Sequence, residues 1–163
     1  WRAEFGVDLF TCHGREEELI QRFSTLGTPP ASTTSPLPRV LVFSPNDPGF
    51  VEDLRPRLPG HIVEVDVVNS AEDGANVARE RAYCACVVKL GTRGNLGKDV
   101  LKALRSAEAA RGGARAFAAV HSATAAERPE TRTKFEVEYG VELFVRHGEE
   151  DQLAAALLHT AMV

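Results

Sequence analysis

The sequence lacks the features that mark several large classes of protein. No apolar stretch approaches the length of about 18 residues that a membrane span requires. No run of lysine or arginine forms a local basic patch, and the net charge of the 163 residues is −4. We therefore expect no membrane span, and no nucleic-acid partner recognised through bulk positive charge.

Cysteine is also scarce. An odd number of cysteines, Cys12, Cys84 and Cys86, argues against a disulfide framework and favours a reducing compartment, so we expect the cytoplasm. Cys84 and Cys86 lie two residues apart in an apolar run, which indicates small buried residues on one face of a strand. A signal-peptide pattern is missing as well, and the chain begins with Trp1, so we expect a piece of a longer or processed chain.

Motifs for catalysis and metal binding are missing too. The Gly-x-Ser-x-Gly pattern of a serine nucleophile elbow is absent, which excludes that class of hydrolase. None of the five histidines stands at metal-ligand spacing from another histidine or a cysteine: His13, His61, His121, His147 and His159. The spacing therefore predicts no metal site.

The sequence does contain enough apolar residues for a core, together with an internal repeat. Hydrophobic residues make up 44% and charged residues 26%, as in a soluble globular domain with a short appendage. Residues 3–23 and 137–157 are offset by 134 and identical at nine of 21 positions, including His13/His147 and Glu16/Glu150. Each copy reads as a glycine, a short apolar strand, His-Gly, an acidic turn and an amphipathic helix. Convergence of two strand–turn–helix units is the alternative to a true repeat.

The segment TPPASTTSPLP, residues 28–38, separates the two copies. Four prolines among serine and threonine favour an extended linker over a packed element. We therefore expect a partial repeat at 1–27, a linker at 28–38 and a domain at 39–163.

The domain alternates between buried strands and helices. The predicted strands are Val40–Phe43, His61–Val68, Tyr83–Leu90, Ala116–Val120 and Val141–Val145. The predicted helices are Phe50–Leu58, a helix capped by Ser70, Lys98–Arg111, Glu127–Tyr139 and Asp151–Met162. Such alternation predicts an α/β, flavodoxin-like, doubly wound parallel sheet of five strands in the order 2-1-3-4-5.

Residues 140–153, GVELFVRHGEEDQL, carry a family resemblance. This segment and the element order over 39–163 resemble the receiver domains of response regulators, in which a Lys-Pro pair precedes the last helix. Arg146 and His147 stand in the positions of that pair. The resemblance implies a signal-transduction module whose typical members accept a phosphoryl group on an aspartate at the end of strand 3, beside a magnesium ion.

The residues that would do this chemistry are altered. The loop after strand 1 carries Ser44, Asn46 and Asp47 where the family has two acidic residues, and Lys89 stands at the phosphoacceptor position. Ser122 is where the family has Ser or Thr. The resemblance is therefore to a pseudo-receiver. Two orientations of Lys89 are open: it pairs with Asp47 inside the pocket, or it extends into solvent.

A receiver frame without receiver chemistry predicts a non-catalytic interaction module with no cofactor. The family resemblance places the contact face on helix 4, strand 5 and helix 5, at Arg132, Phe135, Tyr139, Glu142 and Arg146. We expect a protein partner or self-association, including a dimer formed through residues 1–26.

The glycine-rich segment after strand 3 gives an alternative function. Arg93, Gly94, Gly97 and Lys98 precede a helix and could bind an anion or a nucleotide. The spacing does not match a phosphate-binding P-loop, because Thr92 stands where the first glycine is required. A flexible loop is the other interpretation of this segment.

Overall fold

The computed structural model describes residues 36–91, 96–123 and 127–163. The chain divides into two units, Trp1–Ser35 and Pro36–Val163, and the described residues all belong to the second. The predictions for the partial repeat at 1–27, for most of the linker, and for Arg93 and Gly94 lie outside the described residues.

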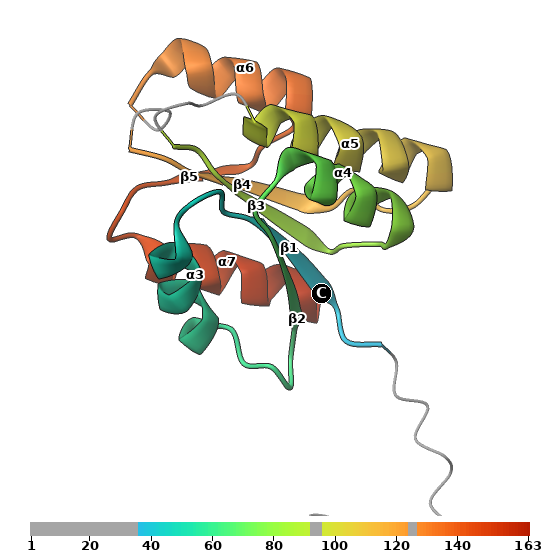
Figure 1. The fold of residues 1–163 in the computed structure, drawn as a ribbon, viewed down its shortest axis with the longest axis horizontal. Coiled ribbons are helices and arrows are strands. Elements are labelled where there is room, and N and C mark those ends of the chain that lie inside the picture. The colour runs from blue at the N-terminus through green and yellow to red at the C-terminus, as the bar shows by residue number, and fades with distance from the viewer. Residues whose placement is uncertain (1–35, 92–95, 124–126) are drawn as a thin grey trace, which may run out of the picture. The chain divides into compact units, whose positions relative to one another are not determined.

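The second unit is a parallel sheet with helices on both faces (Figure 1). Its strands are β1 (Arg39–Phe43), β2 (Glu64–Val68), β3 (Ala85–Lys89), β4 (Phe117–His121) and β5 (Leu143–Val145). Its helices are α3 (Pro48–Leu54), the 3-10 turn η1 (Arg55–Arg57), α4 (Ala71–Glu80), α5 (Leu96–Arg111), α6 (Pro129–Tyr139) and α7 (Glu150–Met162). The strand order is β2-β1-β3-β4-β5, which confirms the predicted flavodoxin-like topology.

The predicted helix Phe50–Leu58 differs most from the observed element. Helix α3 begins earlier, at Pro48, because the Asp47 carboxylate accepts a hydrogen bond from the Phe50 N–H and proline suits the first turn. It ends at Leu54 and continues as η1, which contains Pro56.

The core lies on both faces of the sheet, as the strand alternation requires. Leu41 and Phe43 of β1 pack on the face covered by α4, α5 and α6, whereas Val40 and Val42 pack toward α3 and α7 (Figure 1). The sheet therefore has no solvent-facing side at its centre.

A largely buried ion pair between Arg105 and Glu108 connects α5 to the segment just before β4 and to the end of α6. Glu108 accepts hydrogen bonds from the Ala116 N–H at 2.9 Å and from Arg105 at 2.8 Å. Arg105 also donates to the carbonyls of Tyr139 and Gly140, at 2.7 and 3.2 Å. This network connects the entry to β4 with the end of α6.

The parallel arrangement brings the carboxyl ends of the strands to one edge. Lys89, the last residue of β3, is in register with His121, the last residue of β4, which is in register with Val145. In α/β sheets of this kind the functional site lies at this edge. Among the described residues, no helix is both long and apolar enough to cross a membrane.

Candidate functional site at the carboxyl ends of the strands

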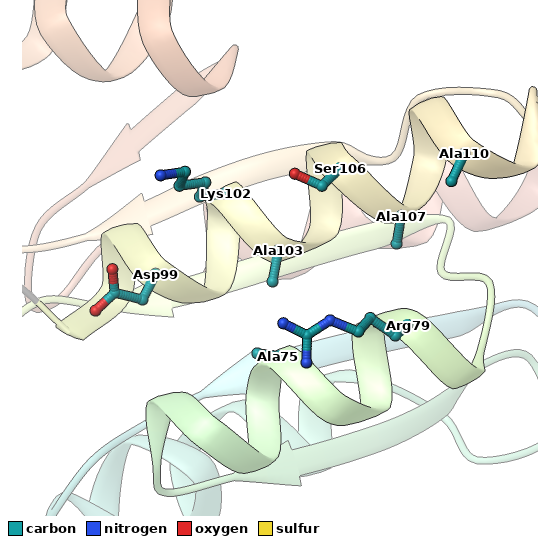
Figure 2. A pocket seen from close by; sticks show the side chains of 8 residues that line it. All are labelled: Ala75, Arg79, Asp99, Lys102, Ala103, Ser106, Ala107 and Ala110. Carbon is teal, nitrogen blue, oxygen red and sulfur yellow. The ribbon is translucent and has the colours of Figure 1, made fainter.

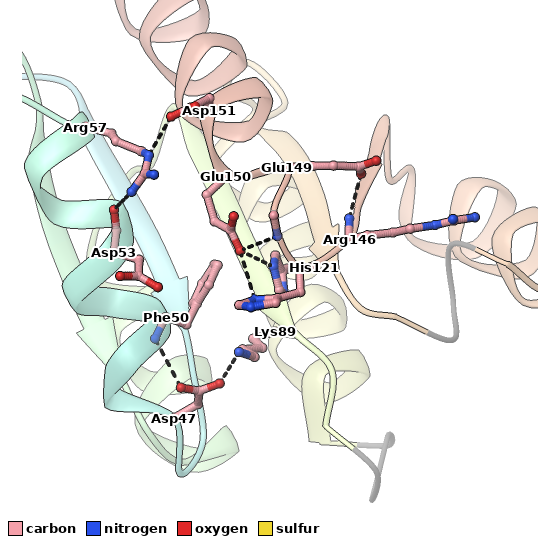
Figure 3. Close-up of polar contacts among 12 residues, drawn as sticks. Asp47, Phe50, Asp53, Arg57, Lys89, His121, Arg146, Glu149, Glu150 and Asp151 are labelled. Carbon is pink, nitrogen blue, oxygen red and sulfur yellow. Dashed lines mark hydrogen bonds and ion pairs between the residues drawn. The ribbon is translucent and has the colours of Figure 1, made fainter.

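The loop after β1 is held in place by its own polar side chains. Ser44 is buried, its N–H donates to the Val68 carbonyl at 3.0 Å, and its hydroxyl donates to the Asp47 carbonyl at 2.8 Å. Asn46 is exposed and has a φ of 59°, in the left-handed region that asparagine tolerates. The turn directs the Asp47 carboxylate toward β3. One carboxylate oxygen accepts a hydrogen bond from the Phe50 N–H and caps α3, and the other contacts the Lys89 ammonium (Figure 3).

Lys89 takes the first of the two orientations considered from sequence. Its ammonium group contacts the Asp47 carboxylate, and it lies 4.9 Å from the centre of the Phe50 ring. The side chains of Lys89 and Asp47 are 19% and 38% exposed, so the pair is partly shielded from water. The hydrogen bond from Lys89, reinforced by the one from the Phe50 N–H, holds the pKa of Asp47 below its ordinary value. The ammonium group and the carboxylate therefore neutralise each other at neutral pH.

His121 is a site residue that sequence reasoning missed. It is 3% exposed at the end of β4, and its ring centre lies 4.5 Å from that of Phe50. Its Nε2 atom lies 3.2 Å from Glu150 Oε1. Burial lowers the pKa of His121, and the contact with Glu150 only partly opposes this, so the ring is neutral at neutral pH.

Glu150, the first residue of α7, is also buried. Its Oε1 atom accepts a hydrogen bond from the Gly148 N–H at 3.1 Å and lies 3.3 Å from His147 Nδ1. Burial raises the pKa of Glu150, but the hydrogen bonds from backbone N–H groups and from His121 outweigh it and hold the pKa below its ordinary value. The carboxylate is therefore ionised at neutral pH although it is buried.

Two further residues predicted for the pocket lie beside it. Ser122 directly follows β4 and is buried, with its N–H donating to the Val145 carbonyl at 2.9 Å. Arg146 is exposed, and its guanidinium lies 3.8 Å from the Glu127 carboxylate, away from Asp47 and Lys89 (Figure 3). The Arg146 side chain therefore does not join the pair.

Of the predicted anion loop, Gly97 and Lys98 are described. A Cβ atom added to Gly97 would lie 2.2 Å from a methyl carbon of Val88. The glycine is therefore required by the close approach of α5 to β3. This packing explains its presence without a ligand.

The predicted contact face on α6, β5 and α7 is corrected at one residue. Phe135 is 2% exposed and packs against Tyr139 at 5.5 Å between ring centres, so it belongs to the core. Arg132 and Glu142 are exposed, as expected of surface residues. Val137, at 78% exposed, is an apolar residue of α6 that sequence reasoning left out.

An open groove lies elsewhere, between α4 and α5 (Figure 2). Its volume is about 450 Å³, and alanines line much of it, with Arg79, Asp99 and Lys102 among its polar residues. Small side chains let the two helices approach each other closely, which accounts for its lining.

No protein-family model matches the sequence, and no curated protein matches it either. Solved structures do match the fold. A sensor protein from Polaromonas sp. JS666 is 25% identical, with a TM-score of 0.58 over 78% of this chain and 98% of that one. The receiver domain of Ssk1 from Saccharomyces cerevisiae, solved with the histidine phosphotransfer protein Ypd1, is 13% identical, with a TM-score of 0.59 over 78% and 90%. The receiver domain of the sensor histidine kinase PA1611 from Pseudomonas aeruginosa PAO1, solved with a magnesium ion in its active-site cleft, is 16% identical, with a TM-score of 0.57 over 78% and 99%. Residues 36–163 thus have the fold of a CheY-like receiver domain.

Proposed function

We propose that this chain is a pseudo-receiver, a signalling module that acts through protein contacts instead of phosphorylation of an aspartate. The observation that carries the proposal is the Lys89 ammonium at the end of β3, in contact with Asp47. It occupies the strand end at which the family resemblance places the phosphoacceptor.

The chemistry of this pair opposes phosphorylation. Aspartyl phosphorylation needs a carboxylate nucleophile and a divalent cation that gathers oxygen ligands. Lys89 offers a positive charge where the cation would bind, and it already satisfies the nearby Asp47 carboxylate. The contact also joins the β1–α3 loop to β3, so the pocket is held in one arrangement without a phosphoryl group.

A protein partner is the most direct use for a receiver frame of this kind. The receiver domain of Ssk1 was solved with the phosphotransfer protein Ypd1, which illustrates a receiver fold engaged with another protein. For this chain we propose the exposed surface of α6, β5 and the β5–α7 loop, which carries the exposed residues Arg132, Val137, Glu142 and Arg146. Charged and polar residues are common on the surfaces through which proteins associate transiently.

The alternative, an anion or nucleotide site after β3, depends on Arg93 and Gly94, which lie outside the described residues, and on Gly97 and Lys98. The packing of Gly97 against Val88 accounts for that glycine.

Treatment of the full chain with acetyl phosphate and Mg²⁺ tests the proposal. We expect no phosphoryl adduct by intact-mass spectrometry and no rise in melting temperature with Mg²⁺ and beryllofluoride. Lys89→Asp alone should not create an adduct, because the β1–α3 loop would still offer a single carboxylate, Asp47. A magnesium-binding receiver domain treated in parallel shows that the reagents work. A hydroxylamine-sensitive adduct on the wild-type chain would overturn the proposal.

A further inference from the structure

Three side chains from three segments converge beside the pocket. His121 ends β4, His147 lies in the β5–α7 loop, and Glu150 begins α7. One ligand atom from each lies within 4.8 Å of the others. In Figure 3 the His121 ring faces the Glu150 carboxylate, and His147 Nδ1 contacts the same Glu150 oxygen.

The spacing of these atoms fits a metal ion. His121 Nε2 and His147 Nδ1 lie 3.2 and 3.3 Å from Glu150 Oε1. Ligands about 2.0–2.1 Å from a tetrahedral zinc ion are separated from one another by roughly 3.3 Å. Two histidines and one carboxylate are a known zinc ligand set that leaves a fourth position open, and imidazole nitrogen selects zinc over magnesium.

The internal repeat adds an independent observation. His147-Gly148-Glu149-Glu150 corresponds to His-Gly-Arg-Glu at residues 13–16, so the histidine, the glycine and the last glutamate recur, whereas Glu149 does not. Gly148 has a φ of 91°, a conformation that favours glycine, and its N–H holds Glu150 Oε1 at 3.1 Å. The recurring residues are therefore the two ligands of the loop and the glycine that orients one of them.

We propose that His121, His147 and Glu150 bind a divalent transition-metal ion of the zinc type, with the fourth position open to water or to a partner's side chain. The chemistry of the cluster suits a cation. One carboxylate and two imidazoles supply the ligand atoms, and the nearby Lys89 ammonium is paired with Asp47. A bound ion would connect the β5–α7 loop, which carries Arg146, to the end of β4. This site does not depend on the proposed signalling function.

Metal titration of the full chain, freed of metal with a chelator, tests the site. We expect one Zn²⁺ to bind at these residues by calorimetry, and Co²⁺ to give the visible absorption bands of a four-coordinate ion. His147→Gln should weaken zinc binding at least about 10-fold, since even loss of an outer-shell partner has effects of that size. His147 is 84% exposed, so this variant removes a ligand without disturbing the core. Glu150→Gln should have a similar effect.

Matched histidine variants separate this site from adventitious binding. His159→Gln removes an exposed histidine of α7, and His13→Gln removes the equivalent histidine of the first sequence copy. Both should keep the Zn²⁺ affinity of the site, and an equal concentration of Mg²⁺ should not displace Co²⁺. The proposal is overturned if neither metal binds up to millimolar concentration, if His147→Gln leaves the affinity unchanged, or if His159→Gln or His13→Gln lowers it as much.

Discussion

At the residue scale, Lys89 and Asp47 show how a lysine at the end of one strand can neutralise a carboxylate that follows the neighbouring strand. Each residue stands at the carboxyl end of a strand or just beyond it, on the neighbouring strands β1 and β3. An acidic residue in place of Lys89 would put two carboxylates close together and favour a cation between them. With lysine, the protein supplies its own positive charge.

The first prediction concerns the coupling between these two side chains. We expect a double-mutant cycle with Lys89→Met and Asp47→Asn to give a coupling free energy of about 1 kcal/mol at pH 7, since Asp47 is more than one-third exposed and water screens the pair. Asparagine keeps an oxygen to cap α3, so the cycle isolates the charge. Urea unfolding of the four chains measures it.

The same coupling should disappear in acid. Because the pKa of Asp47 is lower in the folded chain than its unfolded value of about 3.9, its contribution to stability is present above that value. The contribution is lost as the pH falls through the folded pKa. The coupling measured at pH 7 should therefore decrease once the pH is lowered below the ordinary pKa of an aspartate, in step with protonation of Asp47. A coupling that does not change while Asp47 becomes protonated would show that it does not arise from this charge pair.

The sequence could offer this pair as one of two alternatives because topology alone brings the ends of adjacent parallel strands together. It could not predict the His121 cluster in the same way. The ends of β4 and β5 are also adjacent, but this adjacency does not set the direction of the Glu150 side chain, which begins the following helix. The meeting of His121 and Glu150 depends on how the Gly148 turn leads into α7. Phe135 was wrongly placed on the contact face because the family resemblance assigns whole elements to that face and does not distinguish the buried side of α6 from its exposed side.

At the scale of the elements, α6 is the helix that buries few side chains against the rest of the domain. Phe135 is the one fully buried side chain among its described residues, and its exposed side carries the pairs Arg132–Glu136 and Lys134–Glu138. At its carboxyl end, Arg105 of α5 donates to the carbonyls of Tyr139 and Gly140. The sequence predicted the helix but not this anchor, because the acceptors are backbone carbonyls more than 30 residues away, which no side-chain pattern marks.

The second prediction concerns the network of Arg105 and Glu108. Glu108→Gln removes the charge that balances Arg105 while keeping similar volume, and we expect it to lower the free energy of unfolding by about 3 kcal/mol, as for other buried pairs broken on one side. Chemical denaturation measures the loss. Glu136→Gln is the matched control, because it breaks an exposed pair to Arg132 and should cost less than about 0.5 kcal/mol. Equal small effects of both substitutions would show that the Arg105–Glu108 pair does not stabilise the fold.

At the scale of the whole molecule, the five-stranded domain is complete without the first sequence copy. Residues 143–162 already supply β5 and α7, the positions that residues 1–26 resemble in sequence. The described sheet ends in β2 on one side and β5 on the other, and an edge strand has unpaired backbone groups along one side. A strand from another chain could therefore add to an edge without displacing any part of the domain.

The third prediction follows from this arrangement. An isolated strand–helix pair is marginally stable in water, so we expect residues 1–26 to pair with a second chain and form a dimer. Deleting residues 1–35 leaves the domain intact and should convert the dimer to a monomer in light scattering, with little change in the circular dichroism of the domain. The double variant Leu9→Asp/Phe10→Asp introduces charge into the predicted apolar strand of the first copy. It should also convert the dimer to a monomer, without shortening the chain. Two results would exclude a dimer formed through residues 1–26: a full-length chain that stays monomeric at high concentration, or a truncated chain that remains dimeric. The second result would instead indicate the surface of α6, β5 and the β5–α7 loop as the self-association face.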